Sequence, residues 1–531
     1  MDYEAKDPPS MPSAIALAIE RFVQDLTNLP VDHSIDHALQ NALVAEHEIR
    51  LLLASDPQNA QLHDMFLGLL DIFKVAPAAR RHRARPVDFR TTDFNDYYVF
   101  PVAPRHRRSS LSPSTVPDMQ AFNKNWEIFT HRALLKMSPK DWNNVIAAGG
   151  SVLACLRSTI TNPSSRRLNQ FYQSPIHANS DIDLFLWGLT PAQAELKMQD
   201  IYQAVCDTTA YKVTCVRKAN TVSIHSTYPY RPIQIVLRLY QSPAEILAGF
   251  DIDAACCAYD GKRVWVNPRS LAALVRQANT IDITRRSPSY EIRLAKYAER
   301  GFEVFVPDLR RDLIKRSLYQ KDLAAFPNGL ARLLVLEMAH WRPEGMARRA
   351  NDLPSNNYDG NLGWAQIPYG KHWDADRIEN LIAKKDAWLN SPYNPYNADS
   401  SIGSRHRHVF VAGSMQHCLG AFCRGCSNPE NTTLEGSGIY IQGPIKFIMV
   451  NPGRQLATGS FRPIDIGEWT FEAYEDLHDG SRVQRPSETI RGDAIVNQGG
   501  SPPSEGREDE GAVDEAYMNE FLVPGSWIWS L

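Results

Sequence analysis

The chain has 531 residues, of which 43% are hydrophobic, 22% charged and 10% aromatic. This composition excludes a collagen, a pure coiled coil and a wholly disordered chain. At ~100–200 residues per domain, the length allows several structural units, each large enough to bury a core. Fifty-seven Lys and Arg against 60 Asp and Glu give a net charge of −3, which excludes a uniformly basic nucleic-acid-binding protein.

The lack of a recognisable targeting signal and the low number of cysteines predict an intracellular protein, cytoplasmic or nuclear. No run approaches the ~18 apolar residues that a membrane span needs, and the first residues lack a basic segment followed by an apolar one. Eight Cys are too few for a disulfide scaffold in a chain of this length. We therefore expect no membrane partner and reduced thiols.

Changes in composition along the chain predict a multidomain α+β protein. The expected segments, in chain order, are a helical N-terminal unit (1–78), a basic linker rich in Pro and aromatic residues (79–117), a mixed α/β core (118–301), a helical segment (302–400), a C-terminal unit of short strands (401–480), an acidic disordered segment (481–515) and an apolar docking tail (516–531).

Two of these segments carry opposite charges that cancel in the total. Residues 80–108 hold eight Arg and three Asp, a local charge of +5, interleaved with aromatic side chains. Such a stretch could follow the backbone of RNA or another nucleic acid while its aromatic rings stack on bases. We favour the alternative, a linker whose arginines pair with acidic surface, including residues 498–515 with their six acids and one Arg.

Within the core, apolar spacing and capping residues predict an ordered series of elements. Thr190, Pro191 and Gln193 supply the cap, the first position and the capping box of a helix. The other expected elements are a helix over 120–137, a strand over 144–148, a helix from 151, a buried strand over 181–187, and a hairpin of strands 221–226 and 233–240.

Two motifs in this series carry groups suited to phosphate chemistry. Gly149, Gly150 and Ser151 join a strand to a helix, where backbone N–H groups and a hydroxyl can approach a phosphate. Asp181 and Asp183 are two residues apart on one strand, which puts both carboxylates on the same face about 7 Å apart. Hard cations such as Mg²⁺ prefer oxygen ligands, and phosphoryl transfer needs its charge neutralised.

In this order, the two motifs resemble those of the nucleotidyltransferase superfamily, which has the polymerase-β-like fold, over residues of about 118–300. The resemblance implies that Gly149, Gly150 and Ser151 bind a nucleoside triphosphate and that Asp181 and Asp183 hold Mg²⁺ or Mn²⁺. The implied activity is transfer of a nucleotidyl group from the triphosphate to an unknown acceptor, for which RNA is a candidate.

The chain departs from the family's pattern at its third carboxylate, where Gln234 stands. Three explanations stay open: Asp251 or Asp253 supplies the missing acid, with Asp253 the candidate catalytic residue; two carboxylates suffice at a lower rate; or the chemistry is lost. In the last case the fold would serve as a nucleic-acid-binding, scaffold or assembly-forming protein. The segment between Ser151 and Asp181 is also longer than is usual and must contain an insertion that includes His177.

Several of these residues also have structural interpretations. The two glycines suit an ordinary tight turn, and Ser151 and Asp181 suit helix or strand caps. Arg238 lies on the strand of Gln234 and could reach a phosphate, so we include it among the candidate nucleotide-binding residues. Pairing with a carboxylate is an equally good interpretation of Arg238.

A second cluster combines His417 with Cys418, Cys423 and Cys426. Zinc prefers four tetrahedral nitrogen and sulfur ligands, which this spacing can supply as a closed structural site. Reduced structural cysteines without metal are an equally good interpretation.

Overall fold

The structure is a computed structural model. It describes residues 13–30, 33–83, 97–102, 106–157, 163–287, 289–321, 323–326, 328–341, 367–391, 393, 408–420, 441, 443–451, 468–470 and 472–475. The acidic segment and the apolar tail expected at the C-terminus lie outside these residues.

The described residues form a mixed sheet of nine strands in the order β1-β9-β8-β3-β4-β7-β6-β5-β12 and a three-stranded sheet in the order β10-β11-β2. The strands are β1 (Leu70–Asp71), β2 (Tyr98–Val99), β3 (Val145–Ala148), β4 (Ile182–Trp187), β5 (Thr214–Arg217), β6 (Thr221–His225), β7 (Ile233–Tyr240), β8 (Cys257–Tyr259), β9 (Val264–Val266), β10 (Ala278–Thr280), β11 (Glu303–Phe305) and β12 (Val411–Gly413).

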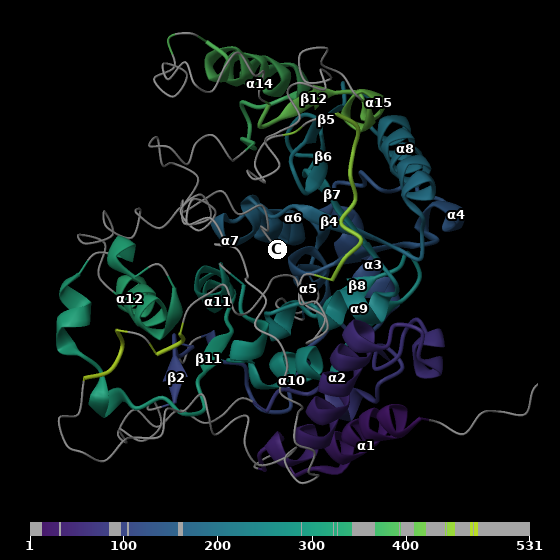
Figure 1. Cartoon of the computed structure of the whole chain (residues 1–531). Coiled ribbons are helices and arrows are strands. Elements are labelled where there is room, and N and C mark those ends of the chain that lie inside the picture. The colour runs from purple at the N-terminus through teal and green to yellow at the C-terminus, as the bar shows by residue number, and fades with distance from the viewer. Residues whose placement is uncertain are drawn as a thin grey trace, which may run out of the picture.

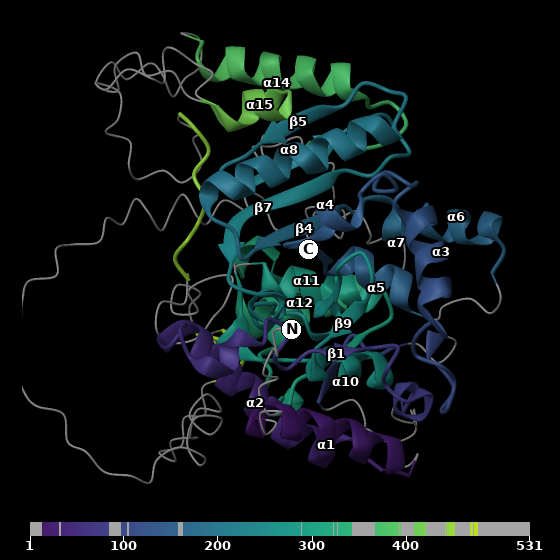
Figure 2. The same ribbon diagram turned by 90° about the vertical axis from the view of Figure 1, so that its right-hand side faces the viewer.

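Helices pack around these sheets. They are α1 (Ala14–Asn28), α2 (Asp36–Ser55), α3 (Met119–Phe129), α4 (Pro139–Trp142), α5 (Gly150–Leu156), α6 (Ser165–Tyr172), α7 (Pro175–Ala178), α8 (Pro191–Thr208), α9 (Pro243–Ala248), α10 (Pro268–Arg276), α11 (Tyr290–Glu299), α12 (Gly329–Trp341), α14 (Ala375–Leu389) and α15 (Met415–Leu419). Helices α1 and α2 lie at one end of the molecule, and α14, α15 and β12 lie at the opposite end (Figures 1 and 2).

The centre of the large sheet carries the expected motifs. Strand β3 runs antiparallel to β4, and β4 runs parallel to β7. Strands β6 and β7 pair antiparallel, which confirms the predicted hairpin. The connection from β4 to β7 contains α8, β5 and β6, and α8 begins with the predicted Thr190–Gln193 capping box. Strand β5, which was not among the predicted strands, extends this half of the sheet.

Distant segments complete the edges of the sheet. Strand β1, from the predicted helical N-terminal unit, pairs with β9, and β12, from the predicted C-terminal unit, pairs with β5. One cluster of buried apolar side chains extends from Phe22 to Ala473. The mixed α+β class is therefore confirmed, and the described parts of the predicted units share a common core.

The described arginines of the basic stretch contact the protein itself. Arg83 donates hydrogen bonds to the carbonyl oxygens of Leu26 and Leu29 at the C-terminal end of α1. Arg107 forms an ion pair with Glu303 at 2.8 Å. The pair of Arg107 with an acid is the kind of contact that the linker interpretation expects, whereas Arg83 contacts backbone carbonyl oxygens. In the described part of the chain, no helix combines the length and the apolar character that crossing a membrane requires.

Candidate functional site

The turn between β3 and α5 has a conformation that glycine favours. Gly149 has φ 87° and ψ −141°, a region that L-residues with a side chain rarely adopt. Its N–H donates to the carbonyl oxygen of Cys257 at 3.0 Å, which fixes the turn against β8. Ser151 follows inside α5, is 2% exposed, and its Oγ is buried without a hydrogen-bond partner. A buried hydroxyl of this kind is free to bind an incoming group.

The two aspartates lie where β4 begins, beside this turn. Asp183 is on β4 opposite Ala148 of β3 and is 2% exposed. Asp181 precedes the strand and is half-buried. Burial, and then the negative charge of Asp181, raise the pKa of the Asp183 carboxyl well above its usual range. A cation that bound here would relieve both effects, because it would neutralise the two negative charges.

Gln234 occupies the position where the resemblance places a third carboxylate. It lies directly opposite Asp183 across the β4–β7 pair. Its Nε2 donates a hydrogen bond to Asp183 Oδ1 at 3.0 Å, and the side chain is buried. The third position is thus filled by a neutral amide that holds Asp183 in place and adds no charge.

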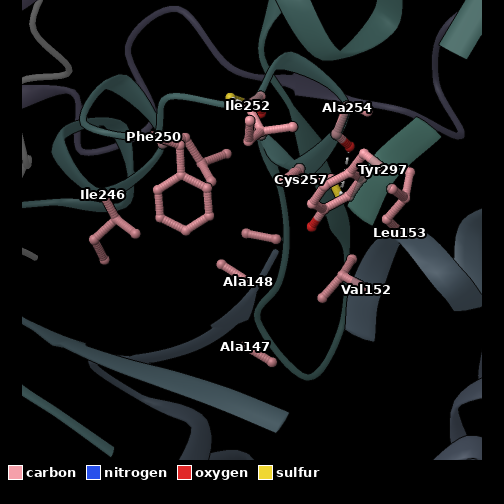
Figure 3. Close-up of a cluster of buried hydrophobic side chains, with 14 of the residues drawn as sticks. Ala147, Ala148, Val152, Leu153, Ile246, Phe250, Ile252, Ala254, Cys257 and Tyr297 are labelled. Carbon is pink, nitrogen blue, oxygen red and sulfur yellow. Dashed lines mark hydrogen bonds between the residues drawn. The ribbon is translucent and has the colours of Figure 1, made fainter. Parts of the chain in front are cut away.

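Helix α11 and the residue that follows it bring two further groups to the Gly149–Ser151 turn. A Cβ at Gly150 would lie 2.8 Å from Arg300 Nη1 and 3.1 Å from the Tyr297 hydroxyl, so glycine permits their close approach. Figure 3 shows the Tyr297 ring in an apolar cluster beside Val152 and Leu153 of α5. The Tyr297 hydroxyl and the Nε and Nη1 of Arg300 are buried without hydrogen-bond partners.

Two half-buried lysines extend the positive charge around the aspartates. Burial, and then the charge of Arg300, lower the pKa of Lys296 to about 8, although Asp181 and Asp183 oppose that shift. Burial likewise lowers the pKa of Lys218, on the β5–β6 turn, to about 8, against the charge of Asp181. Both amines therefore lie in the electrostatic field of the carboxylates.

The two candidate replacements for the third carboxylate are engaged elsewhere. Asp253 Oδ1 pairs with Arg269 at 2.7 Å, and its Oδ2 accepts from the N–H of Thr280 at 2.8 Å. Asp251 forms a buried ion pair with Arg293. These partners give both acids a structural function, so the contacts do not support the expectation that Asp253 completes the catalytic set.

Arg238 is also paired. Its Nη2 lies 2.7 Å from Glu245 Oε1, both side chains are buried, and the guanidinium lies over the Tyr240 ring at 4.4 Å. The contacts favour the carboxylate-pairing interpretation of Arg238 over a position on the nucleotide phosphates.

The predicted zinc cluster is described only in part. His417 is exposed on α15, whereas Cys418 is buried, donates to the carbonyl oxygen of Val411 at 3.6 Å, and has its pKa raised to about 12 by burial. Cys423 and Cys426 lie outside the described residues. Zinc binding therefore stays a prediction, and the contacts of Cys418 are those of a neutral core thiol.

Part of the chain that includes this site is similar to known proteins. Residues 120–277 match the protein-family model described as Gad2, the Gabija anti-defense 2 family. The chain is also 32% identical over 211 residues to uncharacterized protein R883 of Acanthamoeba polyphaga mimivirus. That similarity covers 37% of this chain and 41% of the mimivirus protein, so the chain spans less than half of the relative's length. No solved structure matches the chain.

The region similar to the Gad2 family includes the Gly149–Ser151 turn, both aspartates and Gln234, but ends before α11. Tyr297 and Arg300 lie beyond it and were not among the predicted site residues. No local motif marks them, since they reach the turn only through the packing of α11. The spacing of Arg293, Lys296 and Arg300 on one helix face was the one signal that could have suggested a cationic surface.

Proposed function

We propose that this chain binds a nucleoside triphosphate together with Mg²⁺ or Mn²⁺ and transfers a nucleotidyl group to an acceptor, for which RNA is a candidate. The observation that carries the proposal is the position of Asp181 and Asp183 beside a glycine turn that is surrounded by buried donors without partners. The carboxylates suit the metal, and the donors suit the phosphates.

The donor set fits a hard divalent cation shared with the substrate. Among the residues that the structure describes, no group of three or more His, Cys, Asp or Glu side chains forms a metal site. Asp181 and Asp183 would hold the ion with phosphate oxygens and water as its remaining ligands, as Mg²⁺ commonly binds. When bound, the ion would neutralise the charge that develops during phosphoryl transfer.

The protein's own groups would then position the triphosphate. The hydroxyl groups of Ser151 and Tyr297 can donate to phosphate oxygens, because neither has another partner. Arg300, which approaches Gly150 beside Tyr297, and Lys296 would supply positive charge. In a buried site such preorganised donors stabilise developing negative charge more strongly than they would in water.

Gln234 supports a second candidate, a protein that binds the nucleotide without transferring it. A carboxylate at this position would help a metal ion to lower the pKa of the attacking hydroxyl, whereas the amide hydrogen-bonded to Asp183 cannot. Any transfer would then depend on the two carboxylates Asp181 and Asp183 alone. Without transfer, the protein would be a nucleotide-binding scaffold.

For the biological role, we propose an anti-defense function, on the basis of the similarity to the Gad2 family over residues 120–277. The family description names Gabija as the defense concerned. The test is co-expression of this chain with a Gabija system. Loss of the defense with the wild-type chain, but not with a chain altered at Asp181 and Asp183, would link the role to the site.

The transfer assay is direct. Purified protein is incubated with each labelled nucleoside triphosphate, Mg²⁺ or Mn²⁺, and RNA, beside the Asp181→Ala/Asp183→Ala variant. Label transferred by the wild type and lost in the variant supports the enzyme, and a Gln234→Asp variant should then transfer faster. Metal-dependent nucleotide binding without transfer supports the second candidate, and the absence of both contradicts the proposal.

A further inference from the structure

A small pocket lies along α5, next to the Gly149–Ser151 turn but on the side of the insertion. Its lining includes Gly150 and Arg157 from the two ends of α5, Phe171 and His177 from the insertion, and Arg300. Helices α6 and α7 form this wall, and Arg231 fixes them by donating to the carbonyl oxygens of Tyr172 and His177. Helices α6 and α7 of the insertion are therefore held in place by buried hydrogen bonds.

The polar atoms around this pocket are left without partners. His177 and Arg300 are only 6% and 7% exposed, yet Nδ1 of His177 and both Nε and Nη1 of Arg300 make no hydrogen bond. Nη2 of Arg300 donates to Ser180 Oγ at 2.8 Å. Buried donors normally find an acceptor, and each one without an acceptor costs stability.

The pocket also carries positive charge that the protein does not neutralise. Arg157 donates to the carbonyl oxygen of Arg300 and packs on the Phe302 ring. Within the described ranges, neither Arg157 nor Arg300 forms an ion pair with a carboxylate, and their charges lower the pKa of His177 after burial has done so. Two unpaired guanidinium groups at one pocket create a site for an anion.

We propose that Arg157, His177 and Arg300 form an oxyanion pocket that takes a phosphate group. If the chain binds a triphosphate as proposed above, this group is the terminal phosphate of the triphosphate bound at Asp181 and Asp183. Gly150 connects the two places, since it lines the pocket and opens the turn. A phosphate offers several acceptor oxygens and full negative charge, which match the fork of a guanidinium.

Inorganic pyrophosphate, added without Mg²⁺, is the probe that tests the pocket alone. The variants are Arg300→Met, which keeps the length of the side chain, and His177→Phe, which keeps the ring that packs at 4.8 Å from Phe171. The matched control is Arg310→Met, which removes the same charge from a side chain that is 58% exposed. Calorimetric titration measures affinity, and thermal unfolding without ligand checks folding.

Pyrophosphate should bind the wild type and the Arg310→Met control equally. We expect Arg300→Met to weaken binding about tenfold and His177→Phe about threefold, the range that the loss of one charged or neutral hydrogen bond produces. Arg300→Met should not lower the melting temperature of the ligand-free protein. Equal affinity in all four proteins would overturn the pocket, as would an equal loss in the control. If Arg300→Met fails to fold, the Arg300 side chain is structural, and His177→Phe alone decides.

Two further arms identify the source of the phosphate. With Mg²⁺, Arg300→Met should weaken binding of a nucleoside triphosphate more than that of the monophosphate; an equal effect on both would overturn the terminal-phosphate assignment. Asp181→Asn/Asp183→Asn should lose the metal-dependent nucleotide binding but keep the pyrophosphate binding. A failure of nucleotidyl transfer therefore leaves the pocket standing, and a failure of the pocket leaves the transfer proposal standing.

Discussion

Two buried charged regions of this protein differ in how completely their charges are matched. In the first, between α2 and α10, Glu46 lies 2.9 Å from Arg269 and 2.6 Å from Arg285, and Arg269 also lies 2.7 Å from Asp253. Both signs of charge and the directed hydrogen bonds come from the chain itself. Such a network is complete as folded.

The second region, around the Gly149–Ser151 turn, is incomplete. Asp183 has a neutral amide as its hydrogen-bond partner, while the hydroxyls of Ser151 and Tyr297 and two nitrogens of Arg300 have none. This difference indicates where a ligand binds. Buried polar groups without partners lower the stability of the folded protein, and such groups are common at binding sites.

Breaking the complete network should have the largest effect. Glu46→Gln removes the charge that faces Arg269 and Arg285 and leaves two guanidinium groups buried with one fewer partner. We expect a loss of about 3–5 kcal/mol in the free energy of unfolding, as for other broken buried ion pairs. Urea unfolding measures it.

The control for that prediction is Asp36→Asn, because Asp36 pairs with Arg276 but has 64% of its side chain exposed. An exposed pair contributes only ~0–1 kcal/mol, so this variant should unfold almost as the wild type does. If Glu46→Gln and Asp36→Asn lost similar free energies of unfolding, the distinction between the buried network and an exposed ion pair would be contradicted.

In the incomplete region, removing a charge should stabilise the protein. Because burial and the charge of Asp181 raise the pKa of Asp183, ionisation of this carboxyl opposes folding. Asp183→Asn should therefore raise the free energy of unfolding by about 1–2 kcal/mol at neutral pH without metal, as other substitutions at strained functional sites do. The folded state holds the proton more tightly than the unfolded state, so the gain should shrink as pH falls toward the unfolded value near ~3.9.

Metal binding should weaken as pH falls, in the same direction as the gain from Asp183→Asn. Mg²⁺ needs the ionised carboxylate, and the raised pKa of Asp183 keeps part of the protein protonated at mildly acidic pH. We expect the rise in melting temperature caused by Mg²⁺ with a nucleoside triphosphate to grow as pH increases from about 5 to 8. A response that is independent of pH, or that survives in Asp183→Asn, would contradict this account.

The smallest effect is expected from Tyr297→Phe. It removes a hydroxyl that has no partner and leaves the ring in its apolar cluster (Figure 3). Unfolding should change by less than about 0.5 kcal/mol, while triphosphate affinity should fall severalfold. Tyr259→Phe is the matched control, since that hydroxyl already donates to the carbonyl oxygen of Gly261 at 2.9 Å. It should lose stability without losing affinity.

Local sequence signals predicted the elements around the site well. The glycine turn, the buried strand that carries Asp183, and the capping box that begins α8 all depend on neighbours within a few residues. The predicted helix over 120–137 ends earlier, at Phe129, and residues 130–136 form turns.

Contacts between distant residues were beyond such signals. Sequence spacing could not show that Asp253 pairs with Arg269, or that Arg300 reaches the turn at Gly150, because tertiary packing decides both. From the sequence, Gln234 could be placed on a strand near that of Asp183, but its hydrogen bond to Asp183 could not be predicted. Ion pairing with arginine in the folded chain, rather than residue type, separates Asp251 and Asp253 from Asp183.

The central proposal is that the carboxylates of Asp181 and Asp183 bind the metal ion of a metal-bound triphosphate. The most direct measurement compares thermal unfolding of the wild type and of Asp181→Asn/Asp183→Asn, each with and without Mg²⁺ and a nucleoside triphosphate. The account predicts that the variant is the more stable protein without ligand and that only the wild type is stabilised by ligand. A variant that is less stable without ligand, together with a wild type that does not respond, would contradict it.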